Sequence, residues 1–260
     1  MKEPPSQPTD PLPFVAPCQR LPKAAPFDWL RAGWSDLKSH PGPSLFFGFV
    51  IALISQAVTA ATWQWGNLGL YLGLVSGFVF VAPALAMAFY VISKEHAAGS
   101  SVAVIASLRL ALAAWKRSLV LPVLLIVVLL IWARAANTLY IFYPSINHPK
   151  PSELALFLSI GTVVGALFSL VVFAMSAFSL PMLLDRKVDA VTAVITSINA
   201  VLRNKQAMAV WSIVIVGSVL TGLVTAWLSF IVVMPWIGHA TWHAYQSTID
   251  ASDWPKAPAG

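Results

Sequence analysis

Two histidines near the C-terminus are the side chains in this sequence best suited to bind a metal ion. His239 and His243 lie in the stretch PWIGHATWHAY and are four positions apart, so a helix places them on one face. Such a pair binds zinc, copper or haem iron where further ligands converge. Asp185 and His96 follow two other apolar runs and are the candidates for those ligands. The alternative is that both histidines are polar groups at a membrane surface, beside Trp and Tyr.

Between these alternatives we favour the structural one. His239 comes one turn after Pro235, and we expect it to hydrogen-bond the second helical hairpin near Asp185, with His243 nearer to solvent. The sequence contains no phosphate-binding loop, no G-x-S-x-G elbow and no cysteine-based metal site. We therefore predict no catalytic residue and no cofactor.

The composition indicates a membrane protein that positions these residues on helices. Hydrophobic residues make up 58% of the chain and charged residues 10%, against about 25% charged in soluble domains. A helix needs about 20 apolar residues to cross the hydrocarbon layer. Continuous runs of that kind predict an all-α, polytopic transmembrane helical bundle of six spans within residues 26–250, the last run holding two: Ser44–Thr62, Asn67–Ser93, Ser118–Ala133, Leu154–Leu184 and Gln206–Ile249.

The two ends of the chain differ from this membrane domain. Residues 1–25 are rich in proline and contain the only cysteine, Cys18, but no apolar run of the length of a signal peptide. We predict a disordered cytoplasmic tail over residues 1–25 and a second short cytoplasmic tail over residues 251–260.

The basic residues predict the orientation. With six spans, fourteen of the sixteen Lys and Arg residues fall on one side, and only Arg134 and Lys150 fall on the other. Cytoplasmic loops collect positive charge, so both termini are expected in the cytoplasm. The net charge of +6 then indicates contact with anionic lipid head groups rather than with nucleic acid.

Three amphipathic stretches precede pairs of spans and indicate an internal repeat. Apolar residues recur at helical spacing around residues 27–37, 105–115 and 191–202. Such helices lie either in the membrane interface or on the cytoplasmic face of the bundle. The chain then consists of three units, about 27–95, 100–187 and 188–250, each an interfacial helix followed by a hairpin. The second helix of each hairpin contains one proline: Pro83, Pro181 and Pro235.

Small residues indicate where helices approach each other closely. Glycines recur four positions apart at Gly69, Gly73 and Gly77, and again at Gly161 and Gly165. Glycine faces of this kind let neighbouring helices in a membrane pack against each other. We expect these glycines to be structural.

Three segments carry a resemblance to a known family. FDWLRAGWSDL, SLPMLLDRKVDAVTAVITSINAVLRN and PWIGHATWHAY are similar to segments of a family of bacterial polytopic integral membrane proteins of unknown function, over about residues 26–250. The resemblance implies an inner-membrane helical domain and supplies no catalytic residues.

The spans carry no Asp, Glu or Lys at mid-membrane depth, which argues against an ion-coupled transporter. We expect a non-enzymatic accessory in a membrane or envelope process, with a membrane-protein partner or a second copy of the chain. The alternatives are a channel or permease for an uncharged or lipidic solute, and a metal- or haem-binding membrane protein that uses His239 and His243.

Overall fold

Helices make up the regular structure of the described part of the chain. The computed structural model describes residues 13–66, 74, 86–100, 103–117, 120–139 and 150–257. Two isolated backbone bridges, Cys18 with Ile249 and Arg186 with Lys256, are the extended pairings within those residues. The helices are α1 (Ala25–Ser39), α2 (Pro41–Trp65), α4 (Met87–Ala97), α5 (Val104–Arg117), α6 (Val120–Leu139), α7 (Pro151–Ser176), α8 (Ser179–Asp185), α9 (Ala190–Arg203), α10 (Lys205–Val224) and α11 (Phe230–Thr248).

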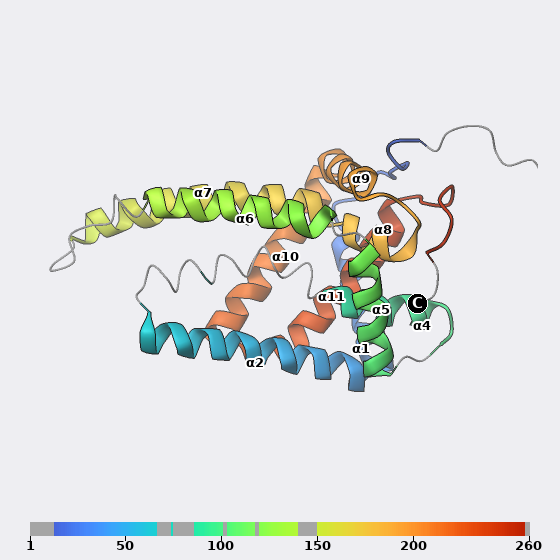
Figure 1. Cartoon of the computed structure of the whole chain (residues 1–260), viewed down its shortest axis with the longest axis horizontal. Coiled ribbons are helices and arrows are strands. Elements are labelled where there is room, and N and C mark those ends of the chain that lie inside the picture. The colour runs from blue at the N-terminus through green and yellow to red at the C-terminus, as the bar shows by residue number, and fades with distance from the viewer. Residues whose placement is uncertain are drawn as a thin grey trace, which may run out of the picture.

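The helices divide into long rods and a compact head. Helices α2, α6, α7 and α10 extend to one side, and α6 runs beside α7 (Figure 1). At the other side α1, α4, α5, α8, α9 and the C-terminal half of α11 gather into what we call the head (Figure 1). Because α1 and α5 run across the direction of α2, the head closes one end of the bundle.

Local sequence signals explain where several helices begin. Proline stands in the first turn of α1, α2 and α7, where its missing N–H group costs no helical hydrogen bond. Asp189 caps α9, because its side chain accepts a hydrogen bond from the backbone N–H of Thr192 at 2.9 Å. Of these prolines, Pro41 marks the junction between the head helix α1 and the rod α2.

Four helical segments are long and apolar enough to cross a membrane, among the residues that are described. At most 28% of the residues in their apolar windows are buried, so most of their apolar side chains face outward, as in contact with lipid. These segments correspond to four of the six expected spans: Pro41–Gln64, Val120–Leu139, Pro151–Asp185 and Lys205–Val224. The second expected span, with Gly69, Gly73, Gly77 and Pro83, falls largely outside the described residues, so the count of six and the three-unit repeat stay predictions.

Helix α11, at the position of the sixth expected span, is not among these four segments. It runs antiparallel to α2: the indole N–H of Trp227 donates to Thr59 at 2.7 Å, and His239 contacts Ser44. Its polar half is covered by α1, α2 and α4. This helix is therefore less apolar than a lipid-facing span because protein, not lipid, surrounds its polar side chains.

Pro235 lies inside α11 and is accommodated by α2. Proline has no N–H to donate to the carbonyl oxygen of Ile231, four residues earlier. Gly48 of α2 faces that carbonyl so closely that an added Cβ would clash with it. The missing side chain of Gly48 lets the two backbones meet where Pro235 interrupts the helical hydrogen bonds.

Among the described residues, the glycines at close contacts between helices include Gly33 and Gly238 but not Gly161 and Gly165. An added Cβ at Gly33 or Gly238 would lie 2.5 Å from Ala240 or Phe89 respectively. At Gly161 and Gly165 an added Cβ would meet no atom within 4 Å. In this structure close packing occurs around α11, whereas the described face of α7 at Gly161 and Gly165 is open.

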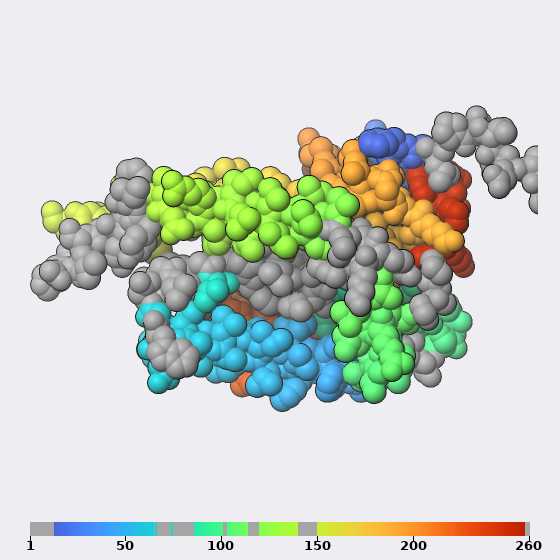
Figure 2. All heavy atoms as spheres, in the orientation of Figure 1, coloured from blue at the N-terminus to red at the C-terminus, as the bar shows by residue number. Residues whose placement is uncertain are grey.

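The described segments near the two ends of the chain, residues 13–24 and 249–257, pack on the head, whereas free tails were expected there. Ala16 is buried, and its N–H donates to Thr196 of α9 at 3.1 Å. In the space-filling view the N-terminal segment from residue 13 lies against α9 (Figure 2). At the other end Trp254 is buried and the N–H of Lys187 donates to Pro255 at 2.8 Å. Backbone hydrogen bonds, rather than apolar periodicity, order these segments; residues 1–12 and 258–260 lie outside the described part.

Candidate functional site

Asp36, near the end of α1, is the centre of a polar cluster in the head. Its side chain is only 5% exposed. His243 of α11 contacts its Oδ2 atom at 2.9 Å, and His96 of α4 lies 3.8 Å from Oδ1. Ser93 of α4 donates to Oδ2 at 2.7 Å. One carboxylate therefore ties together three helices that are far apart in the sequence.

His239 continues this cluster into the interior. The side chain is completely buried, and both of its ring nitrogens are hydrogen-bonded. Its Nδ1 atom lies 2.8 Å from the hydroxyl oxygen of Ser93, and its Nε2 atom lies 2.9 Å from that of Ser44. The ring therefore joins α4 to the first turn of α2.

The direction of these hydrogen bonds follows from donor counting. The hydroxyl of Ser93 has one proton, which it donates to Asp36, so it must accept from Nδ1–H of His239. A neutral His239 then carries no proton on Nε2, which accepts from the hydroxyl of Ser44. The chain of donors thus runs from Ser44 through His239 and Ser93 to Asp36.

The Asp36 carboxyl is held in its ionised form. Burial by itself would raise its pKa, but hydrogen bonds from His243 and Ser93 and the positive charge of the His243 ring outweigh burial, so the pKa lies below its ordinary value. An ionised carboxylate is the acceptor that the Ser93 hydroxyl and the His243 ring require. At neutral pH the negative charge of Asp36 is therefore matched by the hydrogen-bond donors around it.

His40 lies beside this cluster at the junction of α1 and α2. Its ring meets that of His96 edge to face, with the centroids 4.7 Å apart. Its Nδ1 atom is buried and has no hydrogen-bond partner among the described residues. With His96, His239 and His243, four of the five histidines of the chain gather around Asp36.

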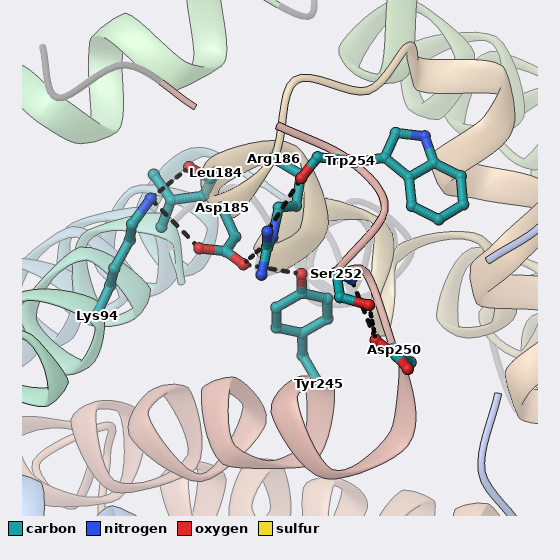
Figure 3. A network of polar contacts seen from close by, with 8 residues as sticks. All are labelled: Lys94, Leu184, Asp185, Arg186, Tyr245, Asp250, Ser252 and Trp254. Carbon is teal, nitrogen blue, oxygen red and sulfur yellow. Dashed lines mark hydrogen bonds and ion pairs between the residues drawn. The ribbon is translucent and has the colours of Figure 1, made fainter. Parts of the chain in front are cut away.

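Asp185 belongs to a separate network, shown in Figure 3. Its Oδ2 atom accepts hydrogen bonds from Tyr245 at 3.1 Å and from the guanidinium of Arg186 at 2.9 Å. Lys94 lies 3.5 Å from its Oδ1 atom and donates to the carbonyl of Leu184. The expectation that His239 reaches Asp185 is therefore wrong: Tyr245 makes that contact, because it lies six residues further along α11.

The C-terminal segment completes this second network. The guanidinium of Arg186 donates to the carbonyl oxygen of Trp254 at 3.0 Å, and the N–H of Ala257 donates to that of Asp185 at 2.8 Å. Asp250 accepts from the Ser252 hydroxyl at 2.6 Å and so closes the turn before this segment (Figure 3). The ends of α4, α8 and α11 are thus fastened together beside the Asp36 cluster.

The structure separates the four residues proposed as metal ligands. His96 and His243 contact Asp36, His239 contacts two serines, and Asp185 lies in the second network. Within the described ranges, no three His, Cys, Asp or Glu residues are placed so that they could hold a metal ion. His243 lies nearer to solvent than the completely buried His239, as expected, but the Asp36 carboxylate holds it in a half-buried place.

Sequence reasoning missed Asp36, Ser44 and Ser93. The one signal for Asp36 is its register: Trp29, Gly33 and Asp36 share the buried face of α1, where a carboxylate requires a partner. No short-range pattern connects Asp36 to His243, which is 207 positions away.

The hydrogen bond from Ser44 to His239 has the direction found in an activated catalytic serine, but a substrate cannot reach it. A serine hydroxyl that donates to a neutral imidazole is the pair used in nucleophilic catalysis. Here both Ser44 and His239 are completely buried. The hydrogen bonds therefore act as ties between α1, α2, α4 and α11.

Comparison with known proteins agrees with this membrane architecture. Residues 70–185 match a family described as "Predicted integral membrane protein (DUF2189)". The chain is an integral membrane protein. It has several apolar helices, and the matched range includes α6, α7 and α8. Of the three segments that carry the resemblance, the matched range contains only the start of the central one, SLPMLLD. It contains neither FDWLRAGWSDL nor PWIGHATWHAY. Comparisons with curated proteins and with solved structures gave no match.

Proposed function

We propose that this chain is a six-span protein of the bacterial inner membrane that acts as a non-enzymatic accessory to another membrane protein. The observation that supports this proposal is the state of His239, the side chain best suited to chemistry. It is completely buried, and both ring nitrogens are used in hydrogen bonds that tie helices together. A group held in this way stabilises a fold rather than meeting a substrate.

Six spans are supported by the course of α11. Trp227 contacts Thr59 near one end of α2, and His239 contacts Ser44 near its other end. Helix α11 therefore covers most of the length that α2 covers, in the opposite direction. With the span expected at residues 67–93, the helices can then pair as three hairpins.

The charge distribution supports an orientation with the head in the cytoplasm. Head residues Arg31, Lys94 and Arg186 lie at the same end of the rods as the first and last described residues, Pro13 and Ala257, whereas Arg134 lies in the last turns of α6, away from the head (Figure 1). Basic residues are retained on the cytoplasmic side. Reporter fusions at Ala98, Lys187 and Asp253 should report the cytoplasm, and fusions at Gly66 and Asn147 the outside; a cytoplasmic signal at Asn147 would contradict six spans.

The accessory role is tested by isolation in native membrane discs, without detergent. We expect a second membrane protein to remain with the chain in a fixed ratio. Two variants are compared with the wild type in this isolation. Leu167→Ser alters the exposed surface of α7, and Ser93→Ala, which disturbs the interior of the head instead, is the control. Loss of the partner with Leu167→Ser alone would identify α7 as its contact. A chain that is isolated alone and supports flux of an uncharged solute in liposomes would overturn the accessory role in favour of a permease.

A further inference from the structure

We propose that helices α1, α5 and α9 form a collar in the cytoplasmic leaflet that binds the head groups of anionic phospholipids. The collar is defined by the outward faces of these three helices, and its placement in that leaflet rests on the orientation proposed above. We infer that lipid binds to this surface from three observations on each helix: the side chains that face the protein, the side chains that are exposed, and the positions of the basic residues.

Helix α9 turns small polar side chains toward the protein. Ser197 accepts a hydrogen bond from the backbone N–H of Phe178 and donates to the carbonyl of Ala174 at 2.7 Å. Thr196 is also buried and bonded to Ala16. Outward, Val191 and Leu202 are exposed, the latter to 57%. Val194 is buried as well, so the exposed apolar side chains of α9 stand at its two ends, at Val191 and Leu202, where a helix on a water-facing surface would carry polar ones.

Helix α5 also has exposed apolar side chains. Ser107 and Ala111 are buried against the head, whereas Leu108 and Leu112 are exposed and Ile105 is exposed to 67%. These three apolar residues follow each other at helical spacing and form one outward stripe. In the space-filling view α5 lies at the surface of the head, beside the beginning of α2 (Figure 2). The stripe thus starts at the level where the first span begins.

Helix α1 presents aromatic side chains on its outer side. Phe27 is exposed to 59% and Trp34 is also exposed, while the polar Asp36 points inward to the histidine cluster. Both α1 and α5 run across the direction of α2 (Figure 1). An orientation across the spans, with large apolar side chains outward, is the one expected of helices that lie in the membrane interface.

A basic residue accompanies the exposed apolar residues on each helix. Arg31 lies four positions after Phe27 and three before Trp34, and its side chain is 82% exposed. Arg109 follows Leu108 on α5, and Arg203 follows Leu202 on α9, both exposed. The ligand of this surface must therefore cover apolar side chains and also carry a negative charge. An anionic phospholipid does both, since its glycerol and acyl region covers the apolar side chains and its phosphate pairs with the guanidinium.

The repetition of this pattern favours lipid over a protein partner. The three outward faces lie on separate helices: α1 packs on α11, α5 packs on α4 and α8, and α9 packs on α6 and α7. One partner protein would need to contact all of them with the same chemistry, whereas the cytoplasmic leaflet surrounds the bundle. The collar therefore matches a surrounding anionic surface.

The first test measures lipid affinity. Wild-type protein in detergent is titrated with phosphatidylglycerol and, separately, with phosphatidylcholine, and bound lipid is counted by native mass spectrometry. Arg31→Gln, Arg109→Gln and Arg203→Gln should each weaken phosphatidylglycerol binding about fivefold, which corresponds to the loss of one basic contact with an anionic lipid. The matched control is Arg134→Gln, which removes the same charge at the opposite end of α6. Equal binding by the triple variant and the wild type would overturn the proposal.

The second test measures the immersion of the collar. In a Cys18→Ser background, nitroxide labels at Leu108→Cys and Leu112→Cys should be accessible to oxygen and shielded from a water-soluble nickel complex in phosphatidylglycerol vesicles. A label at the exposed loop residue Ala98→Cys should be accessible to nickel. Nickel access at residues 108 and 112 in these vesicles would overturn the collar. Both tests use the isolated chain, so a failure to find a partner leaves their outcome unaffected.

Discussion

The Oδ2 atom of Asp36 lies 2.9 Å from the Nε2 atom of His243, although the two residues are 207 positions apart. The same oxygen accepts the hydroxyl proton of Ser93 at 2.7 Å. This one oxygen atom therefore links helix α1 to both α4 and α11. A buried carboxylate without these partners would be costly, so α1 is expected to separate from the head only when the cluster breaks.

Asp36→Asn is expected to destabilise the protein in a pH-dependent way. The pKa of Asp36 is lowered from 3.8 in the folded protein, so ionisation stabilises the fold fully above that ordinary value. That stabilisation is lost as the pH falls through the lower folded-state pKa. At about pH 7 the variant should lose about 1–3 kcal/mol of unfolding free energy. Thermal unfolding in detergent checks this: the difference from wild type should shrink as the pH falls below 3.8, and a constant difference would contradict the prediction.

Ser93→Ala is expected to lower the free energy of unfolding by about 1–3 kcal/mol. It removes the acceptor of the Nδ1–H group of His239 and one of the hydrogen-bond donors to Asp36. The control is Ser159→Ala on α7, an exposed serine that bonds only to the carbonyl of Ala155 in its own helix. The control should change stability by less than about 0.5 kcal/mol. Equal effects of the two substitutions, measured by thermal unfolding, would show that the cluster contributes nothing specific.

Substitutions of glycine distinguish closely packed from open helix faces. Gly238→Ala places a Cβ 2.5 Å from the ring of Phe89, so overpacking should destabilise the protein by about 1–3 kcal/mol. Gly161→Ala meets no atom within 4 Å and should be neutral or stabilise α7 by up to about 1 kcal/mol, the difference in helix propensity. Denaturant unfolding of both variants is the measurement. A destabilising Gly161→Ala would indicate that another molecule packs on α7.

Asn204→Ala is expected to release the N-terminal segment from the head. The Asn204 side chain accepts from the N–H of Leu21 at 2.8 Å and donates to the carbonyl of Gln19 at 3.0 Å. Limited proteolysis should cut the variant near residues 19–23 faster than it cuts the wild type. The free energy of unfolding of the variant should be lower by about 1–3 kcal/mol. Asn137→Ala is the control, since that amide bonds only to Ala133 in its own exposed turn. Unchanged cleavage would mean that other contacts hold the segment.

The sequence by itself determined the class of protein and the location of most helices. Long runs without charge can be stable only in lipid or in a large core, and their lengths exceed those of ordinary core helices. The runs predicted from Ser44 and Leu154 lie within α2 and α7, which begin three residues earlier at Pro41 and Pro151 because proline is tolerated in a first turn. These are local properties, so composition and spacing were sufficient to predict them.

Tertiary structure alone decided which polar residues meet. Asp36, Ser44, Ser93 and His239 lie in four different helices, and no short-range pattern records the distances between them. The expected contact of His239 with Asp185 failed because position along α11 decides the partner: Tyr245, not His239, reaches the end of α8. The predicted tail from residue 13 onward is ordered for the same reason, since its hydrogen bonds go to residues about 180 positions away. Hydrogen bonds between distant segments depend on how the helices pack, and packing depends on shape rather than on local composition.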